Sequence, residues 1–340
     1  MRSAGIGAAI GFAGLALRRL TLLVTLLALV FAAMNLLPGD AARAALGRDA
    51  GPEQLAAKRH ELGLDRPLPV RFWEWITGVA TGDFGSTATG RSVNDLLSAA
   101  APATLLLGGV AFALTVVASL AAGMWWAARP SGLLSRALQP VTTTVVALPE
   151  FVLAALLIAV FALATGWLPA VTVVDSSGYP ASADMLVLPV LALALPQFGW
   201  NTRVIRGALA DAARAPHVEH AQLAGLPPAR IMLRHILPTA LPTIATSFAT
   251  TIGMLLGGAL VVETLFNYPG LGALLAGSVS QRDTTVAAAV TAITATMIMF
   301  VLLLSDTIRA WSVRGRTERV RTRRFAWRTG ALAENAGDLS

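Results

Sequence analysis

The chain has 340 residues, of which 55% are hydrophobic and only 13% are charged, and its mean hydropathy is +0.67. That is far more apolar surface than the core of a soluble domain of this size needs, so the composition predicts an integral membrane protein. The sequence contains no cysteine, which excludes disulfides, thiolate metal sites and thiol nucleophiles.

Six apolar segments are long enough to cross a bilayer, which takes roughly 20 helical residues. They are residues 20–37, 103–128, 141–165, 185–204, 239–262 and 285–308. The first is too long for the core of a signal peptide and lacks a small-residue cleavage site, so we expect it to be retained. Residues 1–17 before it are apolar and rich in glycine and are expected to lie at the membrane interface, and residues 311–340 form a basic tail.

Basic residues gather in every second connection between the predicted spans. The N-terminal segment, the second loop, the fourth loop region and the tail hold 18 of the 26 lysines and arginines. Because such residues stay on the cytoplasmic side, both termini and the loop 205–238 are predicted to be cytoplasmic, and the loop 39–102 extracytoplasmic. The net charge of +7 thus follows the membrane edge, and we expect membrane lipids as its partner and no nucleic acid.

The extracytoplasmic loop 39–102 carries two helical patterns. Leu55 and Leu62 belong to an apolar patch at helical spacing that follows a Gly-Pro pair. Residues 70–80 then alternate aromatic and apolar side chains with Arg71 and Glu74, a pattern typical of a helix that lies flat at the membrane surface.

The stretch 216–238 between the fourth and fifth spans is polar and broken by prolines. Pro216 suits the first position of a helix, and Gly225 suits the left-handed residue just past its end. Pro227 and Pro228 then stop the helix, and a second one can begin directly after them. A short, rigid helix held outside the bilayer has a shape suited to docking into another protein.

Several chemistries are excluded by residues that the chain lacks. A nucleotide-hydrolysing P-loop needs a Gly-Lys pair, and the only lysine is Lys58, which follows an alanine. All four histidines lie outside the spans, so an intramembrane hydrolase would have no base. His217 and His220 share a helix face but have no third metal ligand nearby. We therefore expect a protein that is not an enzyme and that carries no cofactor and no metal.

A few charged residues fall within or near the predicted spans, where a charge is costly unless it meets water or a partner. Glu150 is the deepest and follows Pro149, which loosens the helix. Two interpretations stay open: its carboxylate faces the translocation path, or it pairs with an arginine such as Arg203 in helix packing. Glu263 and Arg203 lie nearer to helix ends and are further candidates for the path, with anchoring of the helix ends as their alternative.

Three glycines clear one face of the fifth span. Gly253 and Gly257 are four residues apart, and Gly258 follows, a spacing that lets two helix backbones approach closely. We expect tight helix packing at this face, against a neighbour in this chain or in a second subunit.

Three stretches together resemble the permeases of ABC importers, in the dipeptide, oligopeptide and nickel branch. In the loop 217–238, Glu219, Ala221 and Gly225 stand at the places of the cytoplasmic signature, which ends in Ile-Leu-Pro. Residues 61–87 (ELGLDRPLPVRFWEWITGVATGDFGST) are similar to the outer-loop signature of this branch, and residues 257–272 (GGALVVETLFNYPGLG) to its fifth-span exit. The similarity covers residues 18–310.

This resemblance implies an all-α membrane protein of six transmembrane helices with the type I ABC importer permease fold, placed in a bacterial cell membrane. The implied partners are a second homologous permease subunit, two cytoplasmic ATP-binding subunits and an extracytoplasmic solute-binding protein. The short cytoplasmic helix would then seat in the ATPase, through His217, Val218, Glu219, His220, Ala221, Gly225 and Leu226.

Two positions of this helix depart from the family pattern, because Ala224 replaces the usual lysine and His217 stands where an aromatic residue is common. The implied solute is a peptide, with nickel or a metal chelate as further members of the class. A secondary, ion-coupled transporter and a passive scaffold are the alternative functions.

Overall fold

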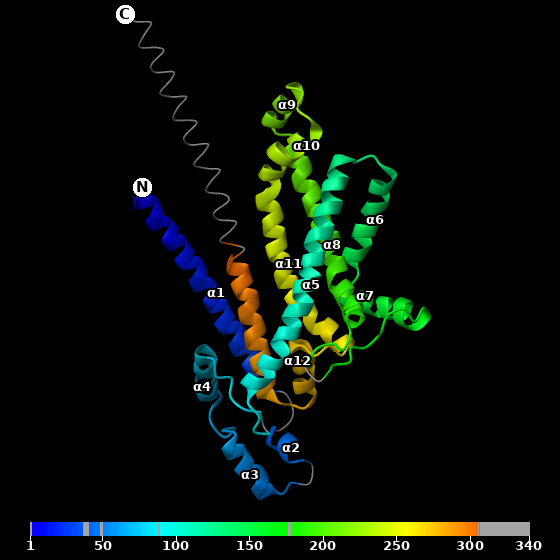
Figure 1. Cartoon of the computed structure of the whole chain (residues 1–340). Coiled ribbons are helices and arrows are strands. Elements are labelled where there is room, and N and C mark those ends of the chain that lie inside the picture. Colours follow the sequence, from blue (N-terminus) through cyan, green and yellow to red (C-terminus); the bar gives the residue numbers. More distant parts are fainter. Residues whose placement is uncertain are drawn as a thin grey trace, which may run out of the picture.

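The structure is a computed structural model of the chain, and it describes residues 2–36, 41–47, 50–87, 89–175, 178–304 and 306. Within these ranges the chain is built from helices, and the only β pairing is in two isolated bridges, Ser86–Ser92 and Val174–Pro180. Figure 1 shows the long helices side by side, with three short helices at one end and α9 and α10 at the other. The helices are α1 (Arg2–Leu36), α2 (Ala41–Leu46), α3 (Pro52–Glu61), α4 (Leu68–Thr81), α5 (Val93–Ala128), α6 (Leu133–Ala147), α7 (Glu150–Leu157), α8 (Val187–Ala213), α9 (Pro216–Leu223), α10 (Pro228–Ile231), α11 (Leu237–Leu265), α12 (Leu271–Ser280) and a final helix, Thr284–Leu304, orange in Figure 1.

Three shorter segments complete these helices. The π-helix η1 (Ile158–Ala164) continues α7, the 3-10 helix η2 (Ala183–Leu186) leads into α8, and the π-helix η3 (Met232–Ile236) joins α10 to α11. In a π-helix each N–H bonds to the carbonyl five residues earlier instead of four, and helices often bend at such segments.

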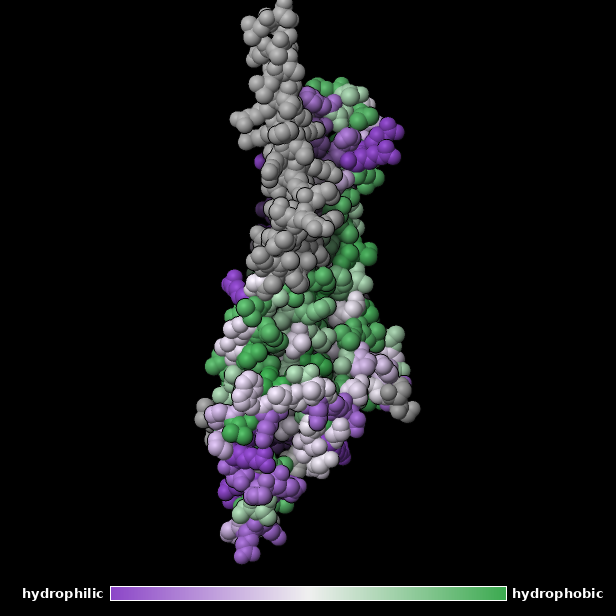
Figure 2. All heavy atoms as spheres, turned by 90° about the vertical axis from the view of Figure 1, so that its left-hand side faces the viewer, coloured by the Kyte–Doolittle hydropathy of each residue, from purple (hydrophilic) through white to green (hydrophobic). Residues whose placement is uncertain are grey.

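In the part of the chain that the structure describes, five helical segments are long and apolar enough to cross a membrane, or six if one sharply bent pair counts as a single span. The five segments are Gly14–Asn35, Val93–Ala128, Ala183–Ala213, Pro228–Leu265 and Thr284–Leu304. Figure 2 shows the matching surface: apolar residues form a band across the middle of the molecule, and polar residues gather at its two ends. This arrangement confirms the predicted all-α membrane architecture.

The third predicted span, residues 141–165, is not one continuous helix. It is divided into α6 and the α7–η1 segment, which meet at an angle of 110°. The break falls at Leu148, whose backbone is extended (φ −80°, ψ 129°). Pro149 explains it, because the proline ring clashes with a helical conformation of the residue before it. Glu150 consequently begins a new helix instead of lying inside a longer one.

Helix α5 begins earlier than the predicted second span, at Val93 rather than residue 103. Ser92 caps it, because its hydroxyl accepts a hydrogen bond from the Asp95 N–H at 3.3 Å. The first ten residues of α5 therefore extend the helix toward the extracytoplasmic end predicted for it.

Helix α8 lies at the centre of the bundle and packs against α5, α6, α7 and α11. Glycines let two of these neighbours approach closely. A Cβ at position 199 would lie 2.8 Å from the Thr142 carbonyl oxygen of α6, and a Cβ at Gly123 of α5 would lie 2.7 Å from Ile205 of α8. The main core, which includes Leu107, Leu193 and Ala259, fills the space between α5, α7, α8 and α11.

Helix α1 and the final helix stand at the edge of the bundle (Figure 1). Leu27 of α1 packs with Ala292 and Ala295 of the final helix. Arg19, eight residues before Leu27 on α1, forms an ion pair of 2.6 Å with Asp306, just past the end of the final helix. Helix α1 runs without interruption from residue 2, so the segment 1–17 that the sequence set apart is joined to the first span by continuous helix in its described residues.

The two helices predicted in the outer loop are present as α3 and α4. The aromatic residues of α4 are divided between two environments. Phe72 and Trp75 contact Phe31 of α1, with ring centroids 5.7 and 5.2 Å away, whereas Trp73 is 67% exposed. Helix α4 is thus fixed to α1 on one side, and its free side carries the ring suited to headgroup depth.

The close packing of α8 on α6 makes a prediction for two glycines of one helix. Gly199→Ala places a methyl group against the Thr142 carbonyl oxygen, and overpacking of this kind costs about 1–3 kcal/mol. Gly207→Ala meets nothing within 4 Å and should gain helix propensity instead. We expect the first variant to melt at a lower temperature than the wild type and the second at the same or a higher one, in detergent thermal unfolding followed by tryptophan fluorescence. Equal melting temperatures in the two variants would contradict the packing argument.

Candidate functional site

The loop 205–238, predicted to be cytoplasmic, folds around residues 216–226 as the sequence predicts. Pro216 occupies the first turn of α9, and Gly225, just after the helix, has a left-handed backbone with φ of 71°. The Leu226 N–H donates to the Ala221 carbonyl at 3.2 Å, which closes the end of the helix. Proline at the start and glycine past the end thus give α9 two fixed ends.

One face of α9 is docked onto the chain itself. Val218 is fully buried and Ala221 is 6% exposed. Both belong to a cluster with Ile231, Ile236 and Ala240, at the ends of α10 and α11, and with Ile205 and Leu209 of α8. Helix α9 therefore rests on the two long helices that flank it in sequence.

The other face of α9 is free. His217, Glu219 and His220 are exposed, and Leu226 is half-buried. Leu223 is 79% exposed, which is a large apolar side chain left in solvent. Sequence reasoning did not select Leu223, although it lies four residues after Glu219 and so on the same helical face. Of the predicted coupling residues, Val218 and Ala221 support the helix from beneath, and the exposed ones are available to a partner.

His217 joins α9 to the π-helix η3. Its Nε2 lies 3.2 Å from the His235 carbonyl oxygen and donates to it in the Nε2-protonated tautomer. The Thr239 hydroxyl donates to the same carbonyl at 3.1 Å. The histidine that replaces the usual aromatic residue thus attaches the start of α9 to the start of the fifth span.

Glu150 lies half-buried at the first position of α7, against α8 and α11. A Cβ at position 258 would collide with its carboxylate, so Gly258 of α11 provides the space that it occupies. The Gln197 amide of α8 also faces the carboxylate. Among the described residues no ion pair joins Glu150 to Arg203.

A buried polar network joins α8 to α11 near the same level of the bundle. The Asn201 side-chain nitrogen donates to the Thr251 hydroxyl at 2.7 Å, and the Ser247 hydroxyl donates to the Asn201 side-chain oxygen Oδ1 at 2.6 Å. Asn201 and Thr251 have no exposed surface. Hydrogen bonds in such surroundings are strong and directional, and sequence reasoning missed this set because no local pattern marks it.

Arg203 lines a cavity of about 420 Å³ between α5, α6 and α8, apart from Glu150. Arg206, one turn along, lies over the ring of Trp126 at 4.4 Å from its centroid. Arg203 itself is exposed.

Glu263 has no exposed surface and holds the turn between α11 and α12. Its Oε2 accepts a hydrogen bond of 2.6 Å from the Gly272 N–H in the first turn of α12. The Thr104 hydroxyl of α5 and the Ala273 N–H also face the carboxylate. A carboxylate at a helix N-terminus is favoured by the unpaired N–H groups there. The structure therefore places Glu263 in the anchoring role, which the sequence offered as the alternative.

Tyr268 holds the same turn against α5. Its hydroxyl donates to the Ala103 carbonyl at 2.9 Å, and the Leu271 N–H donates to the Thr104 hydroxyl at 2.8 Å. Burial, with a smaller contribution from the Glu263 charge, raises the pKa of Tyr268 to about 12, so the phenol stays protonated and remains a donor. The Pro-Gly-Leu-Gly turn predicted to cap the fifth span is thus anchored at two points.

The three glycines of α11 divide into two groups. Gly258 is buried against Glu150, whereas no described residue lies within 4 Å of a Cβ placed at Gly253 or Gly257. Of these three glycines, Gly258 alone packs closely against the part of the chain that the structure describes.

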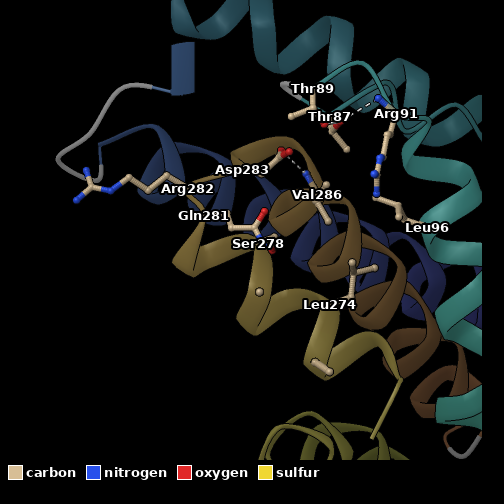
Figure 3. Close-up of a pocket in the computed structure, with 12 residues that line it drawn as sticks. Thr87, Thr89, Arg91, Leu96, Leu274, Ser278, Gln281, Arg282, Asp283 and Val286 are labelled. Carbon is tan, nitrogen blue, oxygen red and sulfur yellow. Dashed lines mark hydrogen bonds between the residues drawn. The ribbon is translucent and has the colours of Figure 1, made fainter. Parts of the chain in front are cut away.

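A cavity of about 430 Å³ opens at the extracytoplasmic end predicted from the charges (Figure 3). Figure 3 shows Ser278 and Gln281 on the α12 side, Thr87 and Arg91 from the outer loop opposite, and the Arg282 side chain pointing away. The Asp283 carboxylate caps the final helix there, because it accepts from the Val286 N–H at 3.2 Å.

The described helices are similar to those of an inward-facing methionine ABC transporter, MetNI, with a TM-score of 0.51, 19% identity and coverage of 63% of this chain and 95% of that chain. That likeness concerns the fold alone.

Comparison of the sequence places the chain in a family. Residues 119–318 match the binding-protein-dependent transport system inner membrane component, and residues 14–97 match the N-terminal part of such membrane components. The chain is 33% identical to the glutathione transport system permease protein of Pectobacterium atrosepticum over 291 residues, which cover 85% of this chain and 92% of that protein. It is 31% identical to a probable peptide ABC transporter permease of Sinorhizobium fredii over 297 residues, which cover 85% and 95%. The chain therefore belongs to the peptide-type ABC importer permeases, and it is an integral inner-membrane transport subunit.

The anchoring role of Glu263 makes a prediction. Glu263→Ala leaves the Gly272 N–H buried without its acceptor and opens a cavity, so we expect the free energy of unfolding to fall by roughly 1–3 kcal/mol. Glu263→Gln retains a carbonyl oxygen for that N–H and should lose less. Thermal unfolding of the purified chain would measure both, and wild-type stability in the alanine variant would contradict this role.

Proposed function

We propose that this chain is the membrane-spanning permease of an ATP-driven importer of small peptides, and that α9 is the element through which ATPase closure moves the spans. The observation that carries this proposal is the two-sided nature of α9. Val218 and Ala221 fix its inner face to the chain, and Glu219, His220 and Leu223 are presented on its outer face. Such a helix transmits a push from a partner, whereas a flexible loop would absorb it.

The supports of α9 determine where that push goes. Its buried face rests on the cluster that includes Ile205 of α8 and Ala240 of α11. The Asn201 network then ties these two helices to each other within the bundle. A displacement of α9 would therefore move α8 and α11 together, toward or away from Glu150 between them.

We assign Glu150 to the translocation path. It is half-buried, sits at the break between α6 and α7, and has Gln197 and Gly258 as its neighbours rather than an arginine. An intramembrane carboxylate without a cationic partner among the described residues is suited to a polar or cationic group of a passing solute, such as the ammonium group of a peptide.

The proposed complex follows from the family. A second homologous permease subunit would pack on the open face of α11 at Gly253 and Gly257, where this chain leaves the space free. One of the two ATP-binding subunits would bind at α9, and a solute-binding protein would deliver solute over the cavity beside Arg91 and Gln281. In this arrangement α9 and both termini are cytoplasmic, and the chain has no ATPase site of its own.

The relatives are named for glutathione and for peptides, so a small peptide is the proposed solute rather than nickel or a metal chelate. No observation favours the ion-coupled alternative.

Uptake by the complete complex distinguishes the ATP-driven importer from an ion-coupled transporter. The chain is reconstituted with its cognate partners in liposomes, and entry of labelled glutathione and of trialanine is measured. We expect uptake of at least one of them to require ATP and a hydrolysis-competent ATPase, and to persist when a protonophore dissipates the proton gradient. Uptake that survives an inactive ATPase and is abolished by the protonophore would refute the proposal.

The left-handed glycine of the loop provides a sharper test of α9. Nothing lies within 4 Å of a Cβ at Gly225, so a substitution there acts through the backbone, whose φ is 71°. Valine is strained in this conformation, whereas asparagine tolerates it. We expect Gly225→Val to reduce co-purification of the ATPase and uptake at least tenfold, and Gly225→Asn to retain most of both, with equal membrane insertion. Full activity of the valine variant would contradict the role of α9.

A further inference from the structure

The cavity between α5, α6 and α8 is lined by both polar and aromatic side chains, although it lies between helices that are apolar enough to span a membrane. It measures about 420 Å³, and its lining includes Trp126, Gln139, Thr143, Trp200, Arg203 and Arg206. A volume of this size is typical of a site that holds part of a small molecule or a headgroup.

The two arginines of the cavity differ in the contacts that they make within the chain. Arg206 lies over the Trp126 ring, which is 2% exposed, and is held there by a cation–π contact. Arg203 is exposed, and no acidic side chain pairs with it among the described residues. A guanidinium in this position presents its donors to an anion with planar or tetrahedral oxygens, which it binds through paired hydrogen bonds.

The position of the cavity along the helices indicates the source of that anion. Trp126 is two residues from the end of α5, and Gln139 lies in the second turn of α6, so the cavity is level with the ends that the loop 129–132 connects. Arginine and tryptophan side chains at the ends of spans mark headgroup depth. Trp200, which is 44% exposed, lies one turn before Arg203 on α8 and therefore nearer to the centre of the predicted span.

Helix α6 lines the cavity with Gln139 and Thr143 and exposes apolar side chains elsewhere on its surface. Leu133 is 88% exposed, Leu134 is 62% exposed and Val141 is 51% exposed. Exposed apolar side chains of this kind are suited to acyl chains, so the cavity lies on a part of the bundle that lipid would surround.

We propose that this cavity binds the phosphate group of an anionic phospholipid, with Arg203 as its ionic contact. The Gln139 amide offers a further donor, and Trp200, which also lines the cavity, lies where the glycerol and acyl region would follow. Arg206 and Trp126 form the floor of the site. Arg203, which the sequence suggested as a translocation-path residue, is on this assignment a lipid contact. The proposal does not depend on the peptide solute or on the role of α9.

A bound lipid would have a consequence for α6. That helix is connected to α5 by a tight loop, in which the Ser135 hydroxyl donates to the Arg129 carbonyl, and it ends at the Leu148 break. A headgroup between α5, α6 and α8 would fix the cytoplasmic half of α6 while the break leaves α7 free to turn.

Native mass spectrometry of the complete transporter tests the site. The complex is purified in detergent and titrated with phosphatidylglycerol or with phosphatidylcholine. We expect one phosphatidylglycerol per copy of this chain to be retained in preference to phosphatidylcholine. Arg203→Ala should weaken that binding roughly tenfold, as for loss of a charged hydrogen-bond partner, and Arg203→Lys should weaken it less. Arg136→Ala, at the same membrane edge but outside the cavity, is the matched control and should bind as the wild type does.

Three results would overturn the proposal. The first is equal retention of phosphatidylglycerol in the wild type and Arg203→Ala. The second is displacement of the retained lipid by millimolar inorganic phosphate, which would identify a site for soluble anions. The third is the absence of any retained lipid from the assembled complex, which would mean that another subunit covers the cavity. Melting temperatures of the Arg203 variants in lipid-free detergent, expected to equal that of the wild type, separate loss of binding from loss of folding.

Discussion

The close approach of α8 to its neighbours is the constraint on which the rest of the molecule depends. Gly199 lets the α6 backbone come near, and Gly123 of α5 accommodates Ile205 in the same way. Apolar helices in a bilayer gain little from burial against one another, because lipid is as apolar as leucine, so intimate backbone packing is what holds them together. With α8 fixed in the centre, its end beside α9 becomes a rigid support for that helix, and its middle brings Gln197 and Asn201 to the residues of α11 and α7 that they meet.

The second element of the design is the pairing of α8 with α11. Asn201 is the shared partner of Ser247 and Thr251, so the two helices are joined by hydrogen bonds as well as by packing. In apolar surroundings an unpaired amide is costly, and separation of the helices at this level would leave several polar groups without partners. We therefore expect α8 and α11 to move as a unit rather than to slide apart. Helix α9, which rests on both of them, needs this behaviour to transmit a displacement.

Local chemistry made much of this predictable from the sequence. Pro216 and Gly225 fix the ends of α9 by rules that involve only neighbouring residues, and the long apolar runs fix the spans. The sequence could not show which group the Glu263 carboxylate contacts. Its partner is the Gly272 N–H, nine residues later across a turn, and that turn is held in place by a hydrogen bond to Thr104 of α5. Asn201 and Thr251 are fifty residues apart, and one amide in an apolar run carries no pattern. The bend at Leu148 was partly visible in Pro149, but proline inside a span often only kinks it, as the unbroken α5 with Pro102 shows.

The two ends of α11 differ in stiffness, and this difference favours one direction of movement. At the extracytoplasmic end predicted for it, the turn into α12 is held by the Glu263 carboxylate and by the Tyr268 hydroxyl, both anchored in buried surroundings. At the other end α11 begins in the π-helix η3, whose hydrogen bonding is shifted by one residue and whose His235 carbonyl is shared by His217 and Thr239. A helix fixed at one end and joined to a deformable turn at the other pivots about the fixed end. A push on α9 would then swing the end of α11 beside α9 most, and the residues near Gly258 and Glu150 less.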